Sequence, residues 1–339
     1  MLITKPVFLH KNYYCPTTTF LRFSNIVSRE DNNSSVVISN YTQPEMLPSL
    51  IREYSKKNLK REIIIDCSAE LINTDTIDIL VELAERYKIT LYFNDCRDHN
   101  DLEKLKKSKI STVQKFFFVE YFYYYIPNWR NSETLELDCE SPSFLLLTGK
   151  PKFERAVFLY KLFKKNLQSY GKISYFGIKN SNEFVANSSF QLDPKEHSFY
   201  SKFYHKVKEF NSSFADDLTV DVDEFDHSIS HTRRFNADFY SAVDFVVIFE
   251  TDLYTNTFFP TEKPMKAIML NKKFIYLGVK GSLAHLKKLM LELHGRDISD
   301  LTDWIDTKYD GIEDLEEKLD CVIELMDTYI KTFKQNKLI

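Results

Sequence analysis

The sequence predicts an α/β protein built from two Rossmann-like lobes. Short apolar runs alternate with helical patterns, a polar stretch over residues 128–142 interrupts this alternation, and the alternation then resumes. Strands that alternate with helices form parallel sheets. A chain of 339 residues is long for one core and natural for two domains. We therefore predict an N-terminal lobe over residues 1–140 and a C-terminal lobe over residues 141–339.

The N-terminal lobe begins the alternation. Short apolar runs predict strands at residues 35–39, 62–66 and 89–93, and helical spacing of apolar residues predicts helices over residues 47–60 and 76–87. Asp66 closes one predicted strand, and Asp95 follows another. The aromatic block Phe116–Tyr125 is predicted to be buried, because aromatic side chains more often fill cores than stack on ligands.

The C-terminal lobe repeats the pattern. Strands are predicted at residues 144–147, 173–176, 239–250 and 273–278. Helices are predicted to begin at Pro151 and to cover residues 262–270 and 315–333. Residues 181–236 have weak periodicity and give the least information about secondary structure.

The pattern with the most chemical content lies in residues 249–278. Glu250 ends an apolar strand, and Glu262 begins a helix that another apolar strand follows. Ligands of α/β sheets bind at the carboxyl ends of strands. Two carboxylates there can accept hydrogen bonds from ribose or sugar hydroxyls, while Lys263 and Lys266, one helical turn apart, can face a phosphate. The pattern predicts a nucleotide-sugar site, although Glu262 and Lys263 could instead be charges that complement a helix dipole.

Phosphate binding by a glycine-rich loop is almost excluded, because the chain contains only 7 glycines. A phosphate must then be held by helix N-termini and side chains. Residues 144–155 suit this task, because an apolar strand leads into a helix start that carries Lys150 and Arg155. Taken alone, Arg155 would more often be a solvated helix residue.

Composition sets further limits. The five cysteines lack CxxC spacing, which indicates neither a zinc site nor disulfides. His227 and His231 are four residues apart beside several acids, but we interpret them as part of a polar loop and predict no bound metal. The N-terminus lacks an export signal, and no apolar run approaches the length of a membrane span. We expect a cytoplasmic monomer without a membrane partner.

Binding of a polyanion would need a local basic patch, because the formal net charge is −4. Arg233 and Arg234 lie beside Phe235 and suit a diphosphate or a nucleic-acid backbone. The basic run 104–109 is a second candidate for backbone contacts. Ordinary surface charge is the alternative for Arg233 and Arg234.

Several of these motifs occur in one order that resembles a known group. The motifs are Leu145–Arg155, Glu250-Thr251, Thr261-Glu262-Lys263 with Lys266, and Trp304–Ile312. They resemble the C-terminal half of glycosyltransferase-like proteins of viruses and bacteria, a group similar to the two-lobed GT-B glycosyltransferases. This resemblance implies a cleft between the two lobes, with the acceptor bound by the N-terminal lobe and the donor by the C-terminal lobe. The resemblance covers about residues 144–330. Pro264 departs from the group's pattern and is compatible with a helix only in the first turn, and Lys150-Pro151-Lys152 replaces an arginine-richer stretch.

The resemblance implies roles for individual residues. Glu250 and Glu262 would hold hydroxyls of the donor, and Lys150, Arg155 and Lys263 would neutralise the diphosphate of a UDP-sugar. Thr261 and Lys266 belong to the same donor-binding motif. Inverting transfer needs a base for the acceptor hydroxyl, and Asp66 and Asp95 are the candidates. Each of these two aspartates could instead cap a helix or form a turn. The cluster Asp306, Tyr309 and Asp310 is interpreted as a capping and turn cluster that packs the last helix.

The implied activity follows from the most similar members of the group. These are phage enzymes that transfer arabinose or glucose to 5-hydroxymethylcytosine in DNA, so we expect UDP-arabinose or UDP-glucose as donor, double-stranded DNA as acceptor and no metal cofactor. A transferase that acts on a glycan or protein is the alternative. A catalytically silent module that binds nucleotide sugars or DNA is a second alternative.

Overall fold

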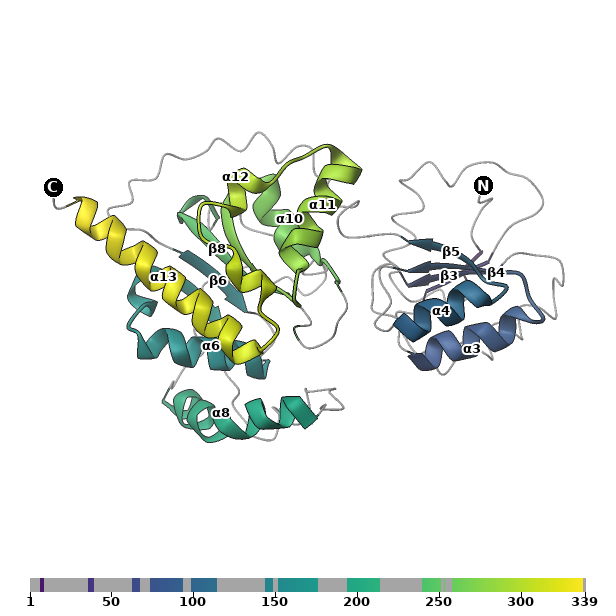
Figure 1. Cartoon of the computed structure of the whole chain (residues 1–339), viewed down its shortest axis with the longest axis horizontal. Helices are drawn as coiled ribbons and strands as arrows, with labels where there is room; N and C mark the ends of the chain where they lie inside the picture. Colours follow the sequence, from purple (N-terminus) through teal and green to yellow (C-terminus); the bar gives the residue numbers. More distant parts are fainter. Residues whose placement is uncertain are drawn as a thin grey trace. The chain divides into compact units, whose positions relative to one another are not determined.

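The computed structural model describes residues 7–8, 36–39, 63–67, 74–93, 99–114, 144–148, 152–175, 194–213, 240–250, 253 and 258–337 (Figure 1). The chain divides into two compact units. The first comprises residues 1–125 with 255–260, and the second comprises residues 126–254 with 261–339. The predicted boundary at residue 140 lies outside the described residues. Both units are α/β with parallel sheets, which confirms the predicted fold class at that level.

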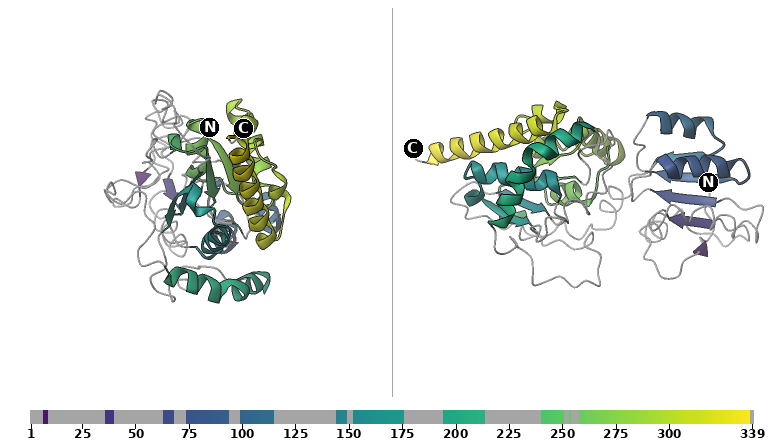
Figure 2. Two further views of the ribbon diagram at one scale, coloured as in Figure 1. Left: turned by 90° about the vertical axis from the view of Figure 1, so that its left-hand side faces the viewer. Right: turned by 90° about the horizontal axis from the view of Figure 1, so that it is seen from below.

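The first unit holds a parallel sheet in the order β1-β2-β3-β4-β5. Its strands are β1 (Val7–Phe8), β2 (Val36–Ser39), β3 (Ile63–Cys67), β4 (Ile89–Phe93) and β5 (Ser111–Gln114). Helices α3 (Thr74–Ala84) and α4 (His99–Lys107) connect the last three strands. Because such crossovers are right-handed and the strands follow in order, both helices lie on one face of the sheet, as Figure 2 also shows.

The core of the first unit forms between that face and the two helices. Ile65, Ile77, Leu80 and Leu91 have no exposed surface. The register pairs Asp66 with Ser39 on one side and with Tyr92 on the other, one residue before β3 ends. The predicted helix over residues 47–60 and the block Phe116–Tyr125 lie outside the described residues.

The second unit holds a parallel sheet in the order β7-β6-β8-β9. Its strands are β6 (Phe144–Thr148), β7 (Gly171–Tyr175), β8 (Phe245–Phe249) and β9 (Lys273–Leu277). Strand β7 lies on one side of β6, whereas β8 and β9 lie on the other. The chain therefore changes winding direction between β6 and β8. This is the topological switch point, outside which open α/β sheets bind their ligands.

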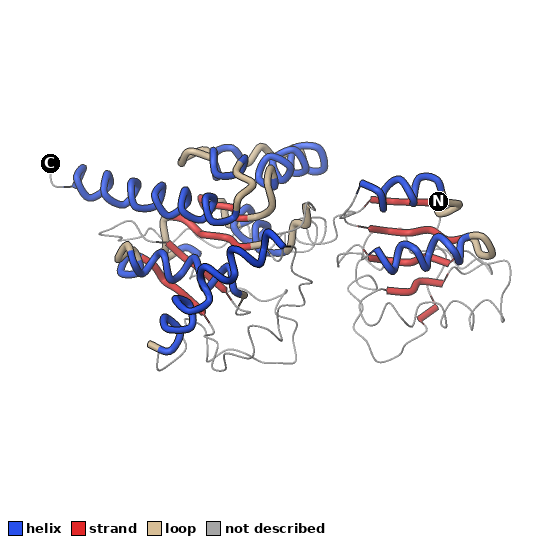
Figure 3. The backbone as a smooth tube through the Cα atoms, turned by 60° about the horizontal axis from the view of Figure 1, so that its bottom comes forward, coloured by secondary structure: helices blue, strands red, loops and turns tan. Residues whose placement is uncertain are grey.

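Helices follow the strands of the second sheet (Figure 3). They are α6 (Phe153–Lys164), α8 (Pro194–Ser212), α10 (Glu262–Met269), α11 (Ser282–His294), α12 (Ser299–Thr302) and α13 (Leu315–Lys337), with short 3₁₀ helices at Gln168–Tyr170 and Lys308–Gly311. Helices α6, α10 and α11 each begin after the carboxyl end of a strand. Their N-termini therefore lie at one edge of the sheet. No helix in the described parts of the chain is long and apolar enough to cross a membrane.

The strand predicted over residues 239–250 begins later in the structure, at Phe245. Tyr240 and Ser241 are helical, a turn follows, and only residues 245–249 form the strand. Ser241 and Asp244 interrupt the apolar run there, so the continuously apolar part is shorter than the prediction assumed. Pro264 is the third residue of α10, in its first turn, where a proline is tolerated.

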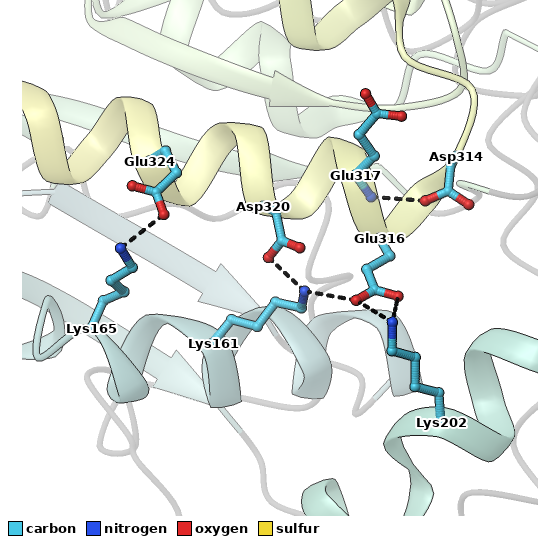
Figure 4. A network of polar contacts seen from close by, with 8 residues as sticks. All are labelled: Lys161, Lys165, Lys202, Asp314, Glu316, Glu317, Asp320 and Glu324. Atoms are coloured by element: carbon cyan, nitrogen blue, oxygen red, sulfur yellow. Dashed lines mark hydrogen bonds and ion pairs between the residues drawn. The ribbon is translucent and has the colours of Figure 1, made fainter.

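Helix α13 is joined to α6 and α8 by ion pairs (Figure 4). Lys161 of α6 contacts Asp320 at 2.5 Å and Glu316 at 3.6 Å, and Lys202 of α8 contacts Glu316 at 2.6 Å. Lys165 contacts Glu324 at 2.8 Å. Pairs with an exposed partner contribute little free energy each, and the Lys161 side chain, 11% exposed, is the least exposed of these groups. The buried face of α13, formed by Leu319, Val322, Ile323, Met326 and Ile330, supplies most of the packing.

The start of β7 requires a glycine because of close approach. A Cβ atom on Gly171 would come within 2.7 Å of three ring atoms of Phe144, the neighbouring residue in register. Phe144 is fully buried and stacks on Phe245 with ring centroids 5.9 Å apart. The Phe144 ring therefore has no room to move away.

We predict that Gly171→Ala lowers the free energy of unfolding by about 1–3 kcal/mol, because it overpacks this core. Gly311→Ala is the matched control, since a Cβ there meets no atom within 4 Å, and it should change stability by no more than about 0.5 kcal/mol. Urea unfolding followed by circular dichroism measures both. Equal effects of the two substitutions would contradict the packing argument.

Candidate functional site

The candidate site lies at the carboxyl edge of the second sheet, beside the switch point. Glu250 follows the last residue of β8, Thr261 and Glu262 begin α10, and Arg155 lies in the first turn of α6 after β6. Strands β6 and β8 are neighbours. The parallel topology thus brings together residues that lie about 95 positions apart in the chain.

Glu250 is the centre of this arrangement. It is 3% exposed, and its two carboxylate oxygens accept three hydrogen bonds from the protein. The backbone N–H of Thr261 donates to Oε1 at 3.0 Å, the Thr261 hydroxyl donates to Oε2 at 2.7 Å, and the Tyr276 hydroxyl donates to Oε1 at 2.9 Å. The backbone N–H of Glu250 also donates to the carbonyl of Leu277. The carboxylate therefore joins β8, β9 and the start of α10.

Thr261 connects Glu250 to helix α10. It is the N-cap residue, it is extended, and its hydroxyl oxygen accepts a hydrogen bond from the backbone N–H of Lys263. The ammonium group of Lys263 donates to the same oxygen at 2.9 Å and lies 3.8 Å from Glu250 Oε2. An N-cap hydroxyl satisfies one of the backbone donors at the helix start. Glu250 and Thr261 together therefore fix the position of Lys263.

Arg155 lies beneath the same edge and is 4% exposed, so its interpretation as a solvated helix residue is wrong. Its guanidinium donates to the carbonyl of Glu250 at 3.3 Å. Burial lowers the pKa of Arg155, and the negative charges of Glu154, Glu250 and Glu262 oppose that change. Arg155 is a buried cation among three carboxylates.

Glu262, Lys263 and Lys266 are the partly exposed members of the cluster. The side chain of Glu262 is 18% exposed and that of Lys263 is 27% exposed. Burial alone would raise the pKa of Glu262, but Lys263, Lys266, its own backbone N–H and Arg155 outweigh burial and lower it. Glu262 is therefore held as a carboxylate that can accept hydrogen bonds, and two ammonium groups adjoin it. This combination suits a ligand that carries both hydroxyls and phosphates.

The N-terminus of α11 lies at the same edge, and a carboxylate of the protein caps its backbone N–H groups. Asp310 accepts hydrogen bonds from the backbone N–H groups of Leu283 at 2.9 Å and Ala284 at 3.1 Å. The Gly281 N–H donates to the Asp310 carbonyl. Asp310 therefore has a structural role, as predicted, but it caps α11 and not the last helix. An anionic ligand would find this helix start already occupied by a carboxylate.

Two buried polar residues of this edge were not identified from the sequence. Tyr276 lies in β9 and supplies one of the hydrogen bonds to Glu250. Lys318 of α13 is 4% exposed and donates to the Gly278 carbonyl at 2.9 Å. Burial lowers the pKa of Lys318, Asp310 opposes that change, and Lys280 adds to it.

The structure does not describe the side chains of the remaining candidates. Asp66 belongs to the first unit, where its backbone alone is described. The other candidates lie outside the described residues: Asp95, Lys150, Arg233, Arg234 and the pair His227 and His231. The described part of the chain contains no group of three acidic, histidine or cysteine side chains arranged to hold a metal ion.

The lysines of the run 104–109 are largely engaged in ion pairs. Lys104 contacts Asp78 at 2.6 Å, Lys106 contacts Glu103 at 3.0 Å, and Lys109 contacts Glu85 at 2.5 Å. Each pair cancels a charge that a nucleic-acid backbone would otherwise meet. The run is thus a weaker candidate for phosphate contacts than its sequence indicates.

Comparison with protein-family models, with curated proteins and with solved structures gave no match. The chemistry of this site is therefore argued from its own residues.

We predict that Glu250→Gln lowers the free energy of unfolding by about 1–3 kcal/mol, because an amide cannot accept all the hydrogen bonds that the carboxylate accepts. The matched control is Glu313→Gln, since the Glu313 side chain is 74% exposed and makes one surface ion pair. The control should change stability by at most about 1 kcal/mol. Urea unfolding of both variants measures these changes. An unchanged free energy of unfolding in Glu250→Gln would show that the carboxylate does not hold α10.

The lowered pKa of Glu262 predicts a pH-dependent contribution to stability. Its folded pKa lies below its ordinary value of 4.5, so ionised Glu262 stabilises the fold above pH 4.5, and this contribution is lost as the pH falls through the folded pKa. The difference in unfolding free energy between the wild type and Glu262→Gln should therefore shrink below pH 4.5. Urea titrations at a series of pH values test this, and a constant difference would contradict it.

Proposed function

We propose that the chain is a two-lobed, GT-B-like glycosyltransferase whose second unit binds a UDP-sugar beside the switch point between β6 and β8. The observation that carries this proposal is the convergence of Arg155, Glu262, Lys263 and Lys266 at that edge of the sheet. Carboxylates recognise the hydroxyls of ribose and sugars, and ammonium groups neutralise phosphates. A ligand with both features matches the exposed part of the cluster.

Each residue has a distinct role in the proposed donor site. Glu262 accepts hydrogen bonds from donor hydroxyls, and Lys263 and Lys266 neutralise the diphosphate. Arg155 supplies a positive charge from beneath the site. Glu250 acts as a positioning residue, because its oxygens are already engaged with Thr261 and Tyr276. Lys150 keeps the diphosphate role that the family resemblance implies.

For the acceptor, the resemblance supports 5-hydroxymethylcytosine in double-stranded DNA, with arabinose or glucose as the transferred sugar. In inverting transfer, the bond between the anomeric carbon and the phosphate oxygen breaks, and the acceptor hydroxyl forms the new bond. Its proton passes to a carboxylate, and UDP leaves. Asp66 and Asp95 stay the proposed candidates for that carboxylate, and Arg233 and Arg234 stay the proposed DNA contacts.

A glycan or protein acceptor is the second candidate. It is favoured by the ion pairs of Lys104, Lys106 and Lys109, which remove much of the local positive charge that DNA binding would use. The formal net charge of −4 points in the same direction.

The donor and the acceptor are tested in one experiment. We expect the purified chain to bind UDP in calorimetry and to add one sugar mass to hydroxymethylated duplex DNA when supplied with UDP-glucose or UDP-arabinose. Glu262→Gln should weaken UDP-sugar binding by about 1–3 kcal/mol, as for the loss of a charge-assisted hydrogen bond. Lys288→Met is the matched control, because Lys288 is an exposed residue on α11 that pairs with Glu292.

The outcomes separate the proposals. UDP-sugar binding and hydrolysis without modified DNA would favour the glycan or protein acceptor. Binding without hydrolysis or transfer would indicate the silent module. A wild-type chain that binds no nucleotide sugar at millimolar concentration would overturn the proposed function.

A further inference from the structure

Two side chains from the C-terminal part of the chain hold the outer edge of β9. Strand β9 is last in the sheet order β7-β6-β8-β9, so β8 pairs with one of its edges only. An edge strand leaves backbone groups without a strand partner. On β9, the N–H of Tyr276 donates to the Tyr309 hydroxyl at 3.2 Å, and the Gly278 carbonyl accepts from the ammonium group of Lys318 at 2.9 Å. Tyr309 and Lys318 therefore bind backbone groups that a further strand would otherwise bind.

The same end of β9 holds Glu250 from the other side. Leu277 lies between Tyr276 and Gly278, and its carbonyl accepts a hydrogen bond from the Glu250 N–H at 2.8 Å. The hydroxyl of Tyr276 donates to Oε1 of Glu250 at 2.9 Å. Three successive residues thus connect the outer edge of β9 to the carboxylate of the candidate site. Any shift of this end of β9 strains or breaks the bonds that position Glu250.

Tyr309 is itself fixed by its neighbour Asp310. The Asp310 carboxylate accepts the backbone N–H groups of Leu283 and Ala284, and its carbonyl accepts that of Gly281 at 2.8 Å. The 3₁₀ helix Lys308–Gly311 is thereby attached to the start of α11. Lys318 is the fourth residue of α13, and Tyr309 and Lys318 are 1% and 4% exposed. The starts of α11 and α13 and the end of β9 therefore form one buried, hydrogen-bonded unit.

We infer that the 3₁₀ helix Lys308–Gly311 and the start of α13 regulate the proposed donor site, with Tyr309 and Lys318 as positioning residues. From the edge of β9 the contacts continue to Glu250, and from Glu250 through Thr261 to the ammonium group of Lys263. A ligand that binds Lys263 favours the arrangement in which Glu250 is held, so the coupling acts in both directions. The regulation rests on the proposed function, whereas the positioning of Glu250 does not. Protection of a sheet edge without any effect on the site is the alternative.

Hydrogen exchange of backbone amides, followed by NMR, tests the positioning in the ligand-free chain. Tyr309→Phe keeps the ring and removes the acceptor of the Tyr276 N–H. It should lower the protection of the Thr261 amide, which donates to Glu250, about ten-fold relative to the amides of α6. Thr261 protection that changes only as much as that of α6 would leave edge protection alone and overturn the inference.

Tyr175→Phe is the matched control. Tyr175 is a buried tyrosine of β7, on the far side of β6, and its hydroxyl donates to Asn211 at the same distance of 3.2 Å. This variant should leave the ratio of Thr261 protection to α6 protection unchanged. Lys318→Met provides a second test at the other contact with β9, and it should lower the same ratio as Tyr309→Phe does.

The reciprocal effect is measured with UDP. Saturating UDP should raise the protection of the Gly281 amide, which donates to Asp310, about five-fold relative to α6. Tyr309→Phe should weaken UDP binding about five-fold in calorimetry, and Tyr175→Phe should not. UDP that binds the wild type with neither effect would overturn the regulation and leave the proposed function in place. A wild type that does not bind UDP would overturn the proposed function and the regulation with it, while exchange in the ligand-free chain still decides whether Tyr309 positions Glu250.

Discussion

The second unit depends on the buried carboxylate of Glu250. A buried charge is costly unless hydrogen bonds and an opposite charge compensate for it. Thr261 and Tyr276 supply three hydrogen bonds, and the ammonium group of Lys263 lies 3.8 Å away. Because these partners come from β9 and α10, the carboxylate can be compensated only when both elements have docked on β8. The same interaction that stabilises the edge therefore determines where Lys263 and Glu262 are placed.

The three helix starts at this edge differ in how they are satisfied, and that difference localises the proposed ligand. The start of α10 is capped by the Thr261 hydroxyl, and that of α11 is capped by the Asp310 carboxylate. The N-cap of α6 is Lys152, whose ammonium group has donors only and cannot cap backbone N–H groups. An anion that approaches the edge meets a carboxylate at α11 and a cation at α6. Binding is therefore favoured on the side of β6 and α6, near Arg155.

Much of the second sheet could be predicted from the sequence, because β6 and β9 are continuous apolar runs and α13 has apolar residues at helical spacing. The site was predicted where a charged residue directly follows an apolar strand, as Glu250 does. Tyr276 was missed because it looks like one more apolar residue of a buried strand, and its contact with Glu250 spans 26 positions. Lys318 gave a signal that could have been used, because it lies four residues before the buried Val322 on the same face of α13.

Helix α8 was not predicted from the sequence, although its apolar residues have helical spacing. Phe199, Phe203, Val207 and Phe210 recur at helical spacing, but the polar residues on both sides obscured the pattern within a long segment of weak periodicity. In the first unit, α4 was missed for a different reason. It has only Leu102 and Leu105 as large apolar residues, and the contacts of its lysines with α3 exist only after the two helices have docked.

The charges of the candidate site place a further constraint on any ligand. Arg155, Lys263 and Lys266 are balanced by Glu154, Glu250 and Glu262, so these six side chains cancel formally. A diphosphate would add negative charge next to Glu262, and Lys263 is already shared between Thr261 and two carboxylates. Full neutralisation of a bound diphosphate would therefore need cations in addition to Lys263 and Lys266. Lys152 at the start of α6 and Lys150, two residues before it, are the candidates for these additional cations. In the proposed site, phosphate binding and the hydrogen bonds of Glu262 to ligand hydroxyls would be coupled, because both depend on the same ammonium group of Lys263.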